Sequence, residues 1–177
     1  MQPTKIEMNA RTPREKRAKT PEQALAALMR LCARAEKSEG DARRLMRGWG
    51  LTEQDAEGVL ARLVRERFID DARYAGAFVR EKLRLSGWGE YKIRTALQRK
   101  GIRRETIDAA LAQADRSGMG ERLAQQLARK LRTVKSATPY ELKTKLVRYG
   151  LSLGYDYETV LETVSGLVKD TDSCDEF

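Results

Sequence analysis

A ten-residue pattern that occurs three times constrains the fold of this chain more than any other feature of its sequence. The copies span residues 42–51, 93–102 and 142–151, so the pattern recurs after 51 and then 49 residues. In each copy, two apolar residues lie four positions apart, a glycine follows four residues later, and leucine or isoleucine comes next. This spacing predicts a short amphipathic helix that ends at a left-handed glycine. A pattern that recurs at this interval also predicts a chain built from similar structural units.

The surrounding sequence favours further helices on both sides of each copy. No proline occurs from Glu22 to Thr138, and this stretch is rich in Ala, Leu, Arg, Glu and Gln. Proline disrupts helix interiors and these other residues favour helices, so we predict an all-α fold. Thr20, Thr52 and Thr138 are expected to cap helix starts. The expected helices span residues 21–36, 40–49, 52–67, 71–86, 90–100, 103–115, 119–134, 139–149 and 156–168.

These helices group into three units, residues 21–69, 70–116 and 117–169, each with three helices. A unit of about 50 residues has a marginal core. We therefore predict three tandem three-helix repeats packed end to end into an elongated array, straight or curved. Residues 1–20 carry six basic and two acidic side chains and are expected to be a mobile basic arm. Residues 170–177 carry four acids and no base and are expected to be an acidic tail.

Composition limits the chemistry that this chain can perform. The net charge is +9, which favours polyanions or acidic protein surfaces as partners. Histidine is absent, so Ser-His and Cys-His catalysis and histidine-containing metal sites are excluded. Cys32 and Cys174 do not form a CxxC motif, and no apolar run is long enough to span a membrane. We therefore expect a cytoplasmic protein that is not an enzyme and needs no cofactor or metal.

Two sets of residues have structural explanations. The adjacent carboxylates Asp70 and Asp71 resemble part of a metal-dependent nuclease site, but such a site usually gathers more acids. We expect both to stabilise the start of the helix predicted at 71–86. The glycines of the repeated pattern are expected to end their helices in the left-handed conformation; they are Gly50, Gly101 and Gly150.

Basic residues are the strongest candidates for binding. The repeated pattern places a cation at positions 43, 94 and 143, next to the apolar stripe of each middle helix. Residues 22–69 hold nine bases and eight acids, whereas 70–114 and 115–169 each hold ten and six, so an interaction surface is expected in the second and third units. A single exposed cation more often belongs to a solvated face. The candidates are Arg43, Arg94, Arg99, Lys100, Arg103, Arg104, Lys143, Lys145 and Arg148.

Two tryptophans are candidate stacking residues for unpaired bases. Trp49 and Trp88 each lie beside glycines and within a few residues of Arg or Lys. Packing in a core or a turn is the commoner role for tryptophan. We therefore hold both roles open for each residue.

The second unit resembles the RecX family of bacterial recombination regulators. The resemblance lies in Phe-Ile-Asp-Asp-Ala-Arg-Tyr-Ala at 68–75, Phe-Val-Arg at 78–80, Gly-Trp-Gly at 87–89 and Lys-Gly-Ile at 100–102. Residues 38–43 are similar to the family's Ser-x-x-Glu-Leu-Arg, although this chain has Asp and Ala in place of Glu and Leu. The resemblance extends over roughly residues 22–168 and is weakest in the third unit.

This resemblance implies a function as well as a fold. It implies tandem three-helix repeats, a cytoplasmic location and binding to the RecA filament on single-stranded DNA, with lowered ATPase and strand-exchange activity. It further implies a role in recombination, DNA repair and the SOS response, without catalysis, and we expect a monomer. From the residues alone, a basic helical DNA-binding protein that contacts phosphates without RecA remains an alternative, since the middle helix and the next one mimic a helix-turn-helix.

Overall fold

The computed structural model describes residues 18–172, and within this range the chain forms nine helices and no strand. The all-α prediction is therefore confirmed. No helix in this range combines the length and apolar character that a membrane crossing requires. The helices are α1 (Pro21–Cys32), α2 (Glu39–Gly48), α3 (Glu53–Arg65), α4 (Asp71–Arg84), α5 (Glu90–Arg99), α6 (Arg104–Ala112), α7 (Met119–Leu131), α8 (Pro139–Ser152) and α9 (Tyr157–Asp172).

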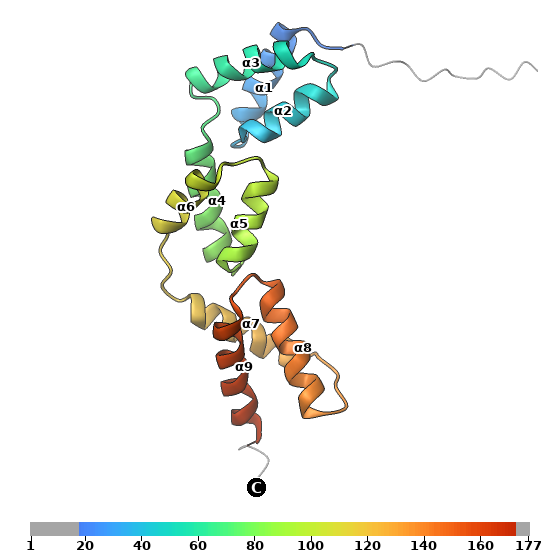
Figure 1. Ribbon diagram of the computed structural model, residues 1–177, viewed down its shortest axis with the longest axis vertical. Coiled ribbons are helices and arrows are strands. Elements are labelled where there is room, and N and C mark those ends of the chain that lie inside the picture. Colours follow the sequence, from blue (N-terminus) through green and yellow to red (C-terminus); the bar gives the residue numbers. More distant parts are fainter. Residues whose placement is uncertain (1–17, 173–177) are drawn as a thin grey trace, which may run out of the picture.

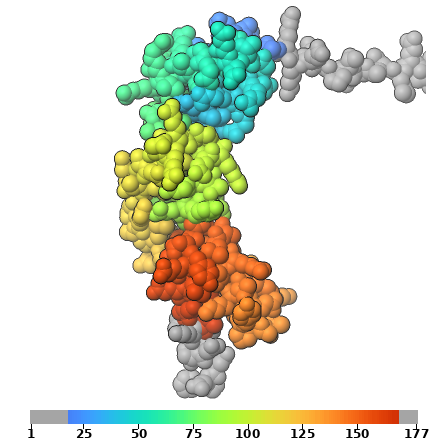
Figure 2. All heavy atoms as spheres, viewed as in Figure 1, coloured from blue at the N-terminus to red at the C-terminus, as the bar shows by residue number. Residues whose placement is uncertain are grey.

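The helices form three units that follow one another along a curved column (Figure 1). Unit 1 contains α1–α3, unit 2 contains α4–α6 and unit 3 contains α7–α9. Each unit buries its own apolar cluster, centred on Leu28 and Leu63 in unit 1, Ile93 and Leu97 in unit 2, and Leu146 in unit 3. The space-filling view shows the same column from end to end (Figure 2). The predicted array of tandem three-helix repeats is present, and it is curved.

The middle helices of successive units meet end to end. At the junction of units 1 and 2, the start of α2 contacts the end of α5, and the Ser38 hydroxyl donates to the carbonyl oxygen of Lys100 over 3.1 Å. The backbones approach so closely that a Cβ on Gly40 would lie 2.0 Å from that carbonyl oxygen. A side chain at position 40 therefore requires the backbone of this junction to shift.

The junction of units 2 and 3 repeats this arrangement. The Gly89 amide donates to the Leu153 carbonyl over 2.8 Å, and the Tyr91 amide donates to the Gly154 carbonyl over 3.1 Å. A Cβ on Gly89 would lie 2.2 Å from the Gly154 oxygen. At both junctions, the carbonyl end of one helix meets the amide end of another, which is the favourable alignment of helix dipoles. As a result α2, α5 and α8 lie on one side of the column, the right side in Figure 1.

The end of α8 corrects one prediction. Gly50 and Gly101 have the expected left-handed backbone, each with φ of 81°, but Gly150 is not among the glycines with positive φ. Gly150 lies inside α8, which continues to Ser152, and a Cβ there would lie 2.6 Å from Cγ1 of Val160. The left-handed glycine that follows this helix is Gly154, with φ of 90°. The absence of a side chain at Gly150 thus lets α9 pack closely against α8. This glycine does not end the helix.

The folded part of the chain extends further toward both ends than predicted. Residues 18–20 belong to the fold, because the Lys19 amide donates to the Trp49 carbonyl over 3.0 Å and Thr20 caps α1. At the other end, α9 extends to Asp172, beyond the start of the predicted acidic tail. The rest of the predicted basic arm and acidic tail lies outside the described residues.

Candidate interaction surface on the middle helices

The repeat-equivalent cations of units 1 and 2 are bound to acids of the same unit. Arg43 on α2 donates from Nε to Glu57 on α3 over 2.7 Å, and this hydrogen bond lowers the pKa of the Glu57 carboxyl. Arg94 on α5 forms the equivalent ion pair with Asp108 on α6, again 14 residues later. In both units, therefore, this cation forms an ion pair that links the middle helix to the third helix.

Unit 3 lacks this ion pair. The residue 14 positions after Lys143 is Tyr157, where units 1 and 2 have a carboxylic acid. Lys143 forms no ion pair with any of the described residues. The three cations are equivalent in sequence, but only Lys143 retains an uncompensated charge.

Lys100 joins two units. Its ammonium group lies 3.0 Å from both carboxylate oxygens of Asp41, a residue of α2 that is only 8% exposed. Arg44 pairs with the same carboxylate. Lys100 thus neutralises a nearly buried acid at the junction of units 1 and 2, which is a structural role.

The other candidates divide into paired and unpaired residues. Arg104 lies 3.7 Å from Asp108, and Lys145 lies 2.6 Å from Glu141. Four candidates form no ion pair with the described residues, and a phosphate or an acidic side chain of a partner would meet their charges directly. They are Arg99, Arg103, Lys143 and Arg148.

Arg99 and Arg148 lie on other faces of their helices than Arg94 and Lys143. Residues five positions apart lie about 140° apart around a helix, so Arg99 is on a different face from Arg94, and Arg148 from Lys143. Arg99 lines a hollow of about 320 Å³ between α5 and the end of α8. The hollow is lined by Trp88, Tyr91, Lys92, Thr95, Ala96, Arg99, Leu151, Ser152 and Gly154.

We call these residues, together with Arg148, the α5–α8 surface. Arg148 lies one turn before Leu151 and Ser152 on the same face of α8, and it is exposed. Lys92, Thr95 and Arg99 likewise share one face of α5. The surface therefore combines three cations with aromatic and apolar groups, and none of its residues is acidic.

The two tryptophans differ in their surroundings. Trp49 packs on the core of unit 1, and the Lys19 ammonium lies 5.3 Å from its ring centre. Trp88 contacts the core of unit 2 and also lines the hollow, with the Lys92 ammonium 4.7 Å from its ring centre. This cation–π contact holds the Lys92 ammonium beside the hollow, where it adds positive charge. Stacking on Trp88 or Trp49 stays a prediction.

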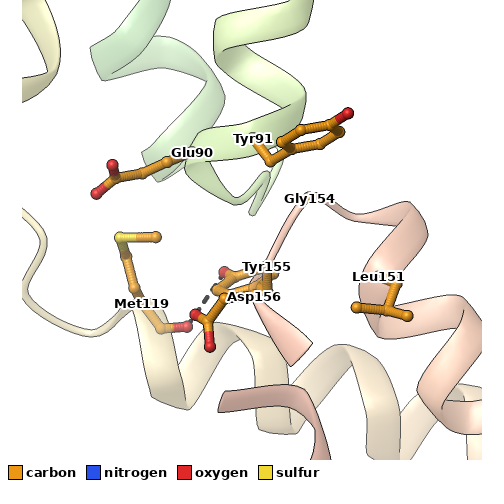
Figure 3. A pocket seen from close by; sticks show the side chains of 7 residues that line it. All are labelled: Glu90, Tyr91, Met119, Leu151, Gly154, Tyr155 and Asp156. Atoms are coloured by element: carbon orange, nitrogen blue, oxygen red, sulfur yellow. Dashed lines mark hydrogen bonds between the residues drawn. The ribbon is translucent and has the colours of Figure 1, made fainter. Parts of the chain in front are cut away.

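Sequence reasoning missed Tyr91, the most exposed aromatic residue of this surface. This residue is 73% exposed at the edge of the hollow. The sequence shows a tyrosine near a helix start. Its exposure depends on how unit 3 packs against α5, which the sequence does not reveal. Figure 3 shows Tyr91 and Leu151 on opposite sides of the junction of the two units.

Tyr91 and Leu151 also border a second hollow of about 540 Å³, drawn in Figure 3. Glu90 and Asp156 contribute carboxylates here, and the buried Tyr155 hydroxyl donates to the Met119 carbonyl over 3.2 Å. Because two of its lining residues are acidic, this hollow is unsuited to phosphate. Arg116 already pairs with Glu90 here, over 2.9 Å.

The carboxylates at the start of α4 have separate roles. Asp70 caps α4 as predicted, accepting from the Arg73 amide over 3.0 Å. Asp71 instead accepts from the Glu39 amide at the start of α2 over 2.9 Å, so it stabilises a helix of the preceding unit. Burial raises the pKa of the Asp71 carboxyl, and the Glu39 hydrogen bond partly opposes this shift. Within residues 18–172, no group of three or more His, Cys, Asp or Glu residues could hold a metal ion.

Known proteins resemble this chain along most of its length. Residues 70–111 match the family described as RecX, second three-helix domain. A regulatory protein RecX from Chlorobaculum tepidum is 30% identical over 141 residues, which cover 80% of this chain and 86% of that protein. Another from Clostridium botulinum is 33% identical over 131 residues, 72% of this chain. The chain spans about 60% of the length of this clostridial relative.

Solved structures show the same fold. A crystal structure of a regulatory protein RecX superimposes with a TM-score of 0.73 at 22% sequence identity. The superposition covers 85% of this chain and 73% of the other. The arrangement of three-helix units is therefore shared with a protein of quite different sequence.

Proposed function

Because this chain belongs to the RecX family, we propose that it is a non-enzymatic regulator of recombination that binds the RecA filament on single-stranded DNA and lowers its ATPase and strand-exchange activity. The observation that best supports this proposal is the α5–α8 surface, where unpaired cations lie beside exposed aromatic and apolar groups. A nucleoprotein filament presents phosphates, bases and protein side chains, and this surface offers complementary groups to each.

The shape of the molecule supports the same partner. Three units in a column, with their middle helices on one side, present an extended face to a partner that itself repeats (Figure 1). Each additional contact with such a partner becomes intramolecular once the first has formed, so modest contacts combine into tight binding. A helical filament of identical protomers fits this description.

The first prediction concerns the activity itself. With RecA hydrolysing ATP on single-stranded DNA, adding the full chain at less than one molecule per RecA protomer should lower the steady-state rate. The physical reason is that an elongated molecule can contact several protomers at once. The measurement is ATP turnover during a titration with this protein, using RecA from the same source. Unchanged turnover with the protein in excess would contradict the proposal.

The alternative function is binding to DNA by phosphate contacts without RecA. The unpaired charges of Arg99 and Arg148 favour it as well, because they would serve equally on a bare strand. The two functions differ in the preferred target. A regulator of the filament binds RecA-coated DNA more tightly than bare DNA of the same length, whereas a DNA-binding protein competes with RecA for the strand.

A further inference from the structure

A cleft with three arginines lies at the junction of units 2 and 3, apart from the α5–α8 surface. It measures about 300 Å³ and opens between the end of α4, the following turn and one face of α7. We call it the arginine cleft. It is lined by Arg84, Leu85, Ser86, Gly87, Arg122, Gln125, Gln126 and Arg129.

The cleft is held in shape by contacts between the two units. The Gln126 side-chain amide donates to the Gly87 carbonyl over 2.9 Å, which ties α7 to the turn after α4. Arg122 donates from both terminal nitrogens to the Ser117 carbonyl, over 3.2 and 3.0 Å. These contacts position the Arg122 guanidinium and the backbone of the turn before any ligand arrives, which lowers the entropic cost of binding.

The charges in the cleft are largely uncompensated. No lining residue is acidic, and Arg84 and Arg129 form no ion pair or hydrogen bond with the described residues. Hydrogen bonds from Ser117 lower the pKa of the nearby Asp115 carboxyl, and the charges of Arg122 and Arg84 lower it further. Its oxygens, however, already accept from the amide and hydroxyl of Ser117 over 2.8 and 2.9 Å. Arg84 and Arg122 are therefore near one acid that already binds Ser117, and no acid among the described residues pairs with Arg129.

Further arginines lie beyond the cleft along both helices. Arg80 precedes Arg84 by one turn of α4, and Arg132 follows Arg129 by three residues at the end of α7. Both are exposed and form no ion pair with the described residues. Arg122 and Arg129 are separated by about 10 Å of helix axis, so the positive charges are spread along the cleft and beyond it.

We propose that the arginine cleft binds the phosphate groups of a single nucleic-acid strand. Guanidinium groups form paired hydrogen bonds with phosphate, and the spread of the charges suits a series of phosphates better than one ion. Leu85 at the edge of the cleft is 82% exposed and offers apolar surface to a sugar or base. The proposal deepens the proposed function and rests on it in one respect, namely that this function brings the protein to a DNA strand.

The test removes two of the three charges from the full chain. The double variant Arg84→Gln and Arg129→Gln keeps the Arg122 contacts with Ser117 and changes only exposed side chains. The matched control, Arg30→Gln and Arg34→Gln, removes the same charge from exposed residues at the end of α1 in unit 1. The probe is a fluorescently labelled oligothymidylate without RecA, titrated over a range of salt concentrations.

The expected results follow from counterion release. The cleft variant should bind the strand about tenfold more weakly, and the slope of log K against log salt should become shallower by about 1.4, since each phosphate contact contributes about 0.7 on a single strand. The control variant should keep the wild-type slope, and both should keep the wild-type thermal midpoint. Equal losses in the two variants, or an unchanged slope in the cleft variant, would overturn the proposal.

Two further arms identify the ligand and separate this proposal from the proposed function. Inorganic phosphate should displace the strand no better than chloride at equal ionic strength, and specific displacement would mean a single-ion site. A cleft variant that binds the bare strand normally but loses the RecA filament would mean that the cleft contacts protein. Both outcomes would overturn the proposal. Wild-type protein that binds the strand but leaves RecA turnover unchanged would instead contradict the proposed function alone.

Discussion

At the scale of single residues, Asp71 shows how one carboxylate can serve a helix distant in sequence. Replacing it by Ala removes the acceptor of the Glu39 amide at the start of α2, whereas Asn keeps an acceptor oxygen there. We therefore expect Asp71→Ala to lower the free energy of unfolding by about 1–3 kcal/mol and Asp71→Asn to lower it by less. Urea denaturation of both variants at pH 7 measures the difference. Equal losses would contradict the assigned hydrogen bond.

The raised pKa of Asp71 adds a dependence on pH. In the unfolded chain this carboxyl has a pKa of about 3.9. Burial raises its pKa in the folded protein. The folded state therefore takes up the proton more readily than the unfolded state. The free-energy cost of burying the ionised carboxylate is present above the folded-state pKa, and it disappears as the pH falls toward the unfolded-state pKa. Wild-type protein should gain stability relative to Asp71→Asn as pH is lowered from 7 to about 4. A difference in unfolding free energy that stays constant over this range would contradict it.

At the scale of helices, the junctions depend on close contact between backbones. A methyl group at Gly40 would meet the Lys100 carbonyl, which belongs to the backbone and cannot rotate away. Gly40→Ala should therefore lower the free energy of unfolding by about 1–3 kcal/mol through overpacking. The matched control is Gly58→Ala in α3, where no atom lies within 4 Å, and it should raise stability by about 0.5–1 kcal/mol. Thermal or urea unfolding of the two variants should thus give shifts of opposite sign.

At the scale of the whole molecule, the unpaired cations of units 2 and 3 should determine binding to the filament. Reversing Arg99 and Arg148 to Glu leaves every ion pair among the described residues intact, whereas reversing Arg94 would place a second acid beside Asp108. We expect Arg99→Glu with Arg148→Glu to weaken filament binding at least tenfold, through charge repulsion with a polyanion, and to keep the thermal midpoint. The measurement is binding to RecA-coated DNA at two salt concentrations.

The control for this prediction reverses the same charge on a different part of the column. Arg30→Glu with Arg34→Glu changes exposed residues at the end of α1, outside the α5–α8 surface. Filament binding that falls equally in both double variants would mean that only net charge matters. Unchanged binding in the Arg99 and Arg148 variant would assign these arginines to a solvated face and leave Tyr91 and Trp88 as the remaining candidates.

The sequence by itself determined the helical class, the threefold repetition and the helix starts at Thr20, Thr52 and Thr138. These depend on local chemistry, because a threonine hydroxyl accepts from an amide three residues later and apolar spacing follows the period of the same helix. Helix ends were less predictable, since α8 continues past Gly150, where Val160 of α9 leaves no room for a side chain.

Only the tertiary structure decided which cations remain uncompensated. Arg94 and Lys143 occupy equivalent positions in sequence, but the pairing of Arg94 depends on whether the third helix brings an acid to it, and Tyr157 takes that place in unit 3. The partner of Asp71 and the arginine cleft also arise where separate units meet. Charges and apolar periods are properties of a sequence, whereas the compensation of a charge requires two groups within a few ångströms, and that distance is set by the packing of helices.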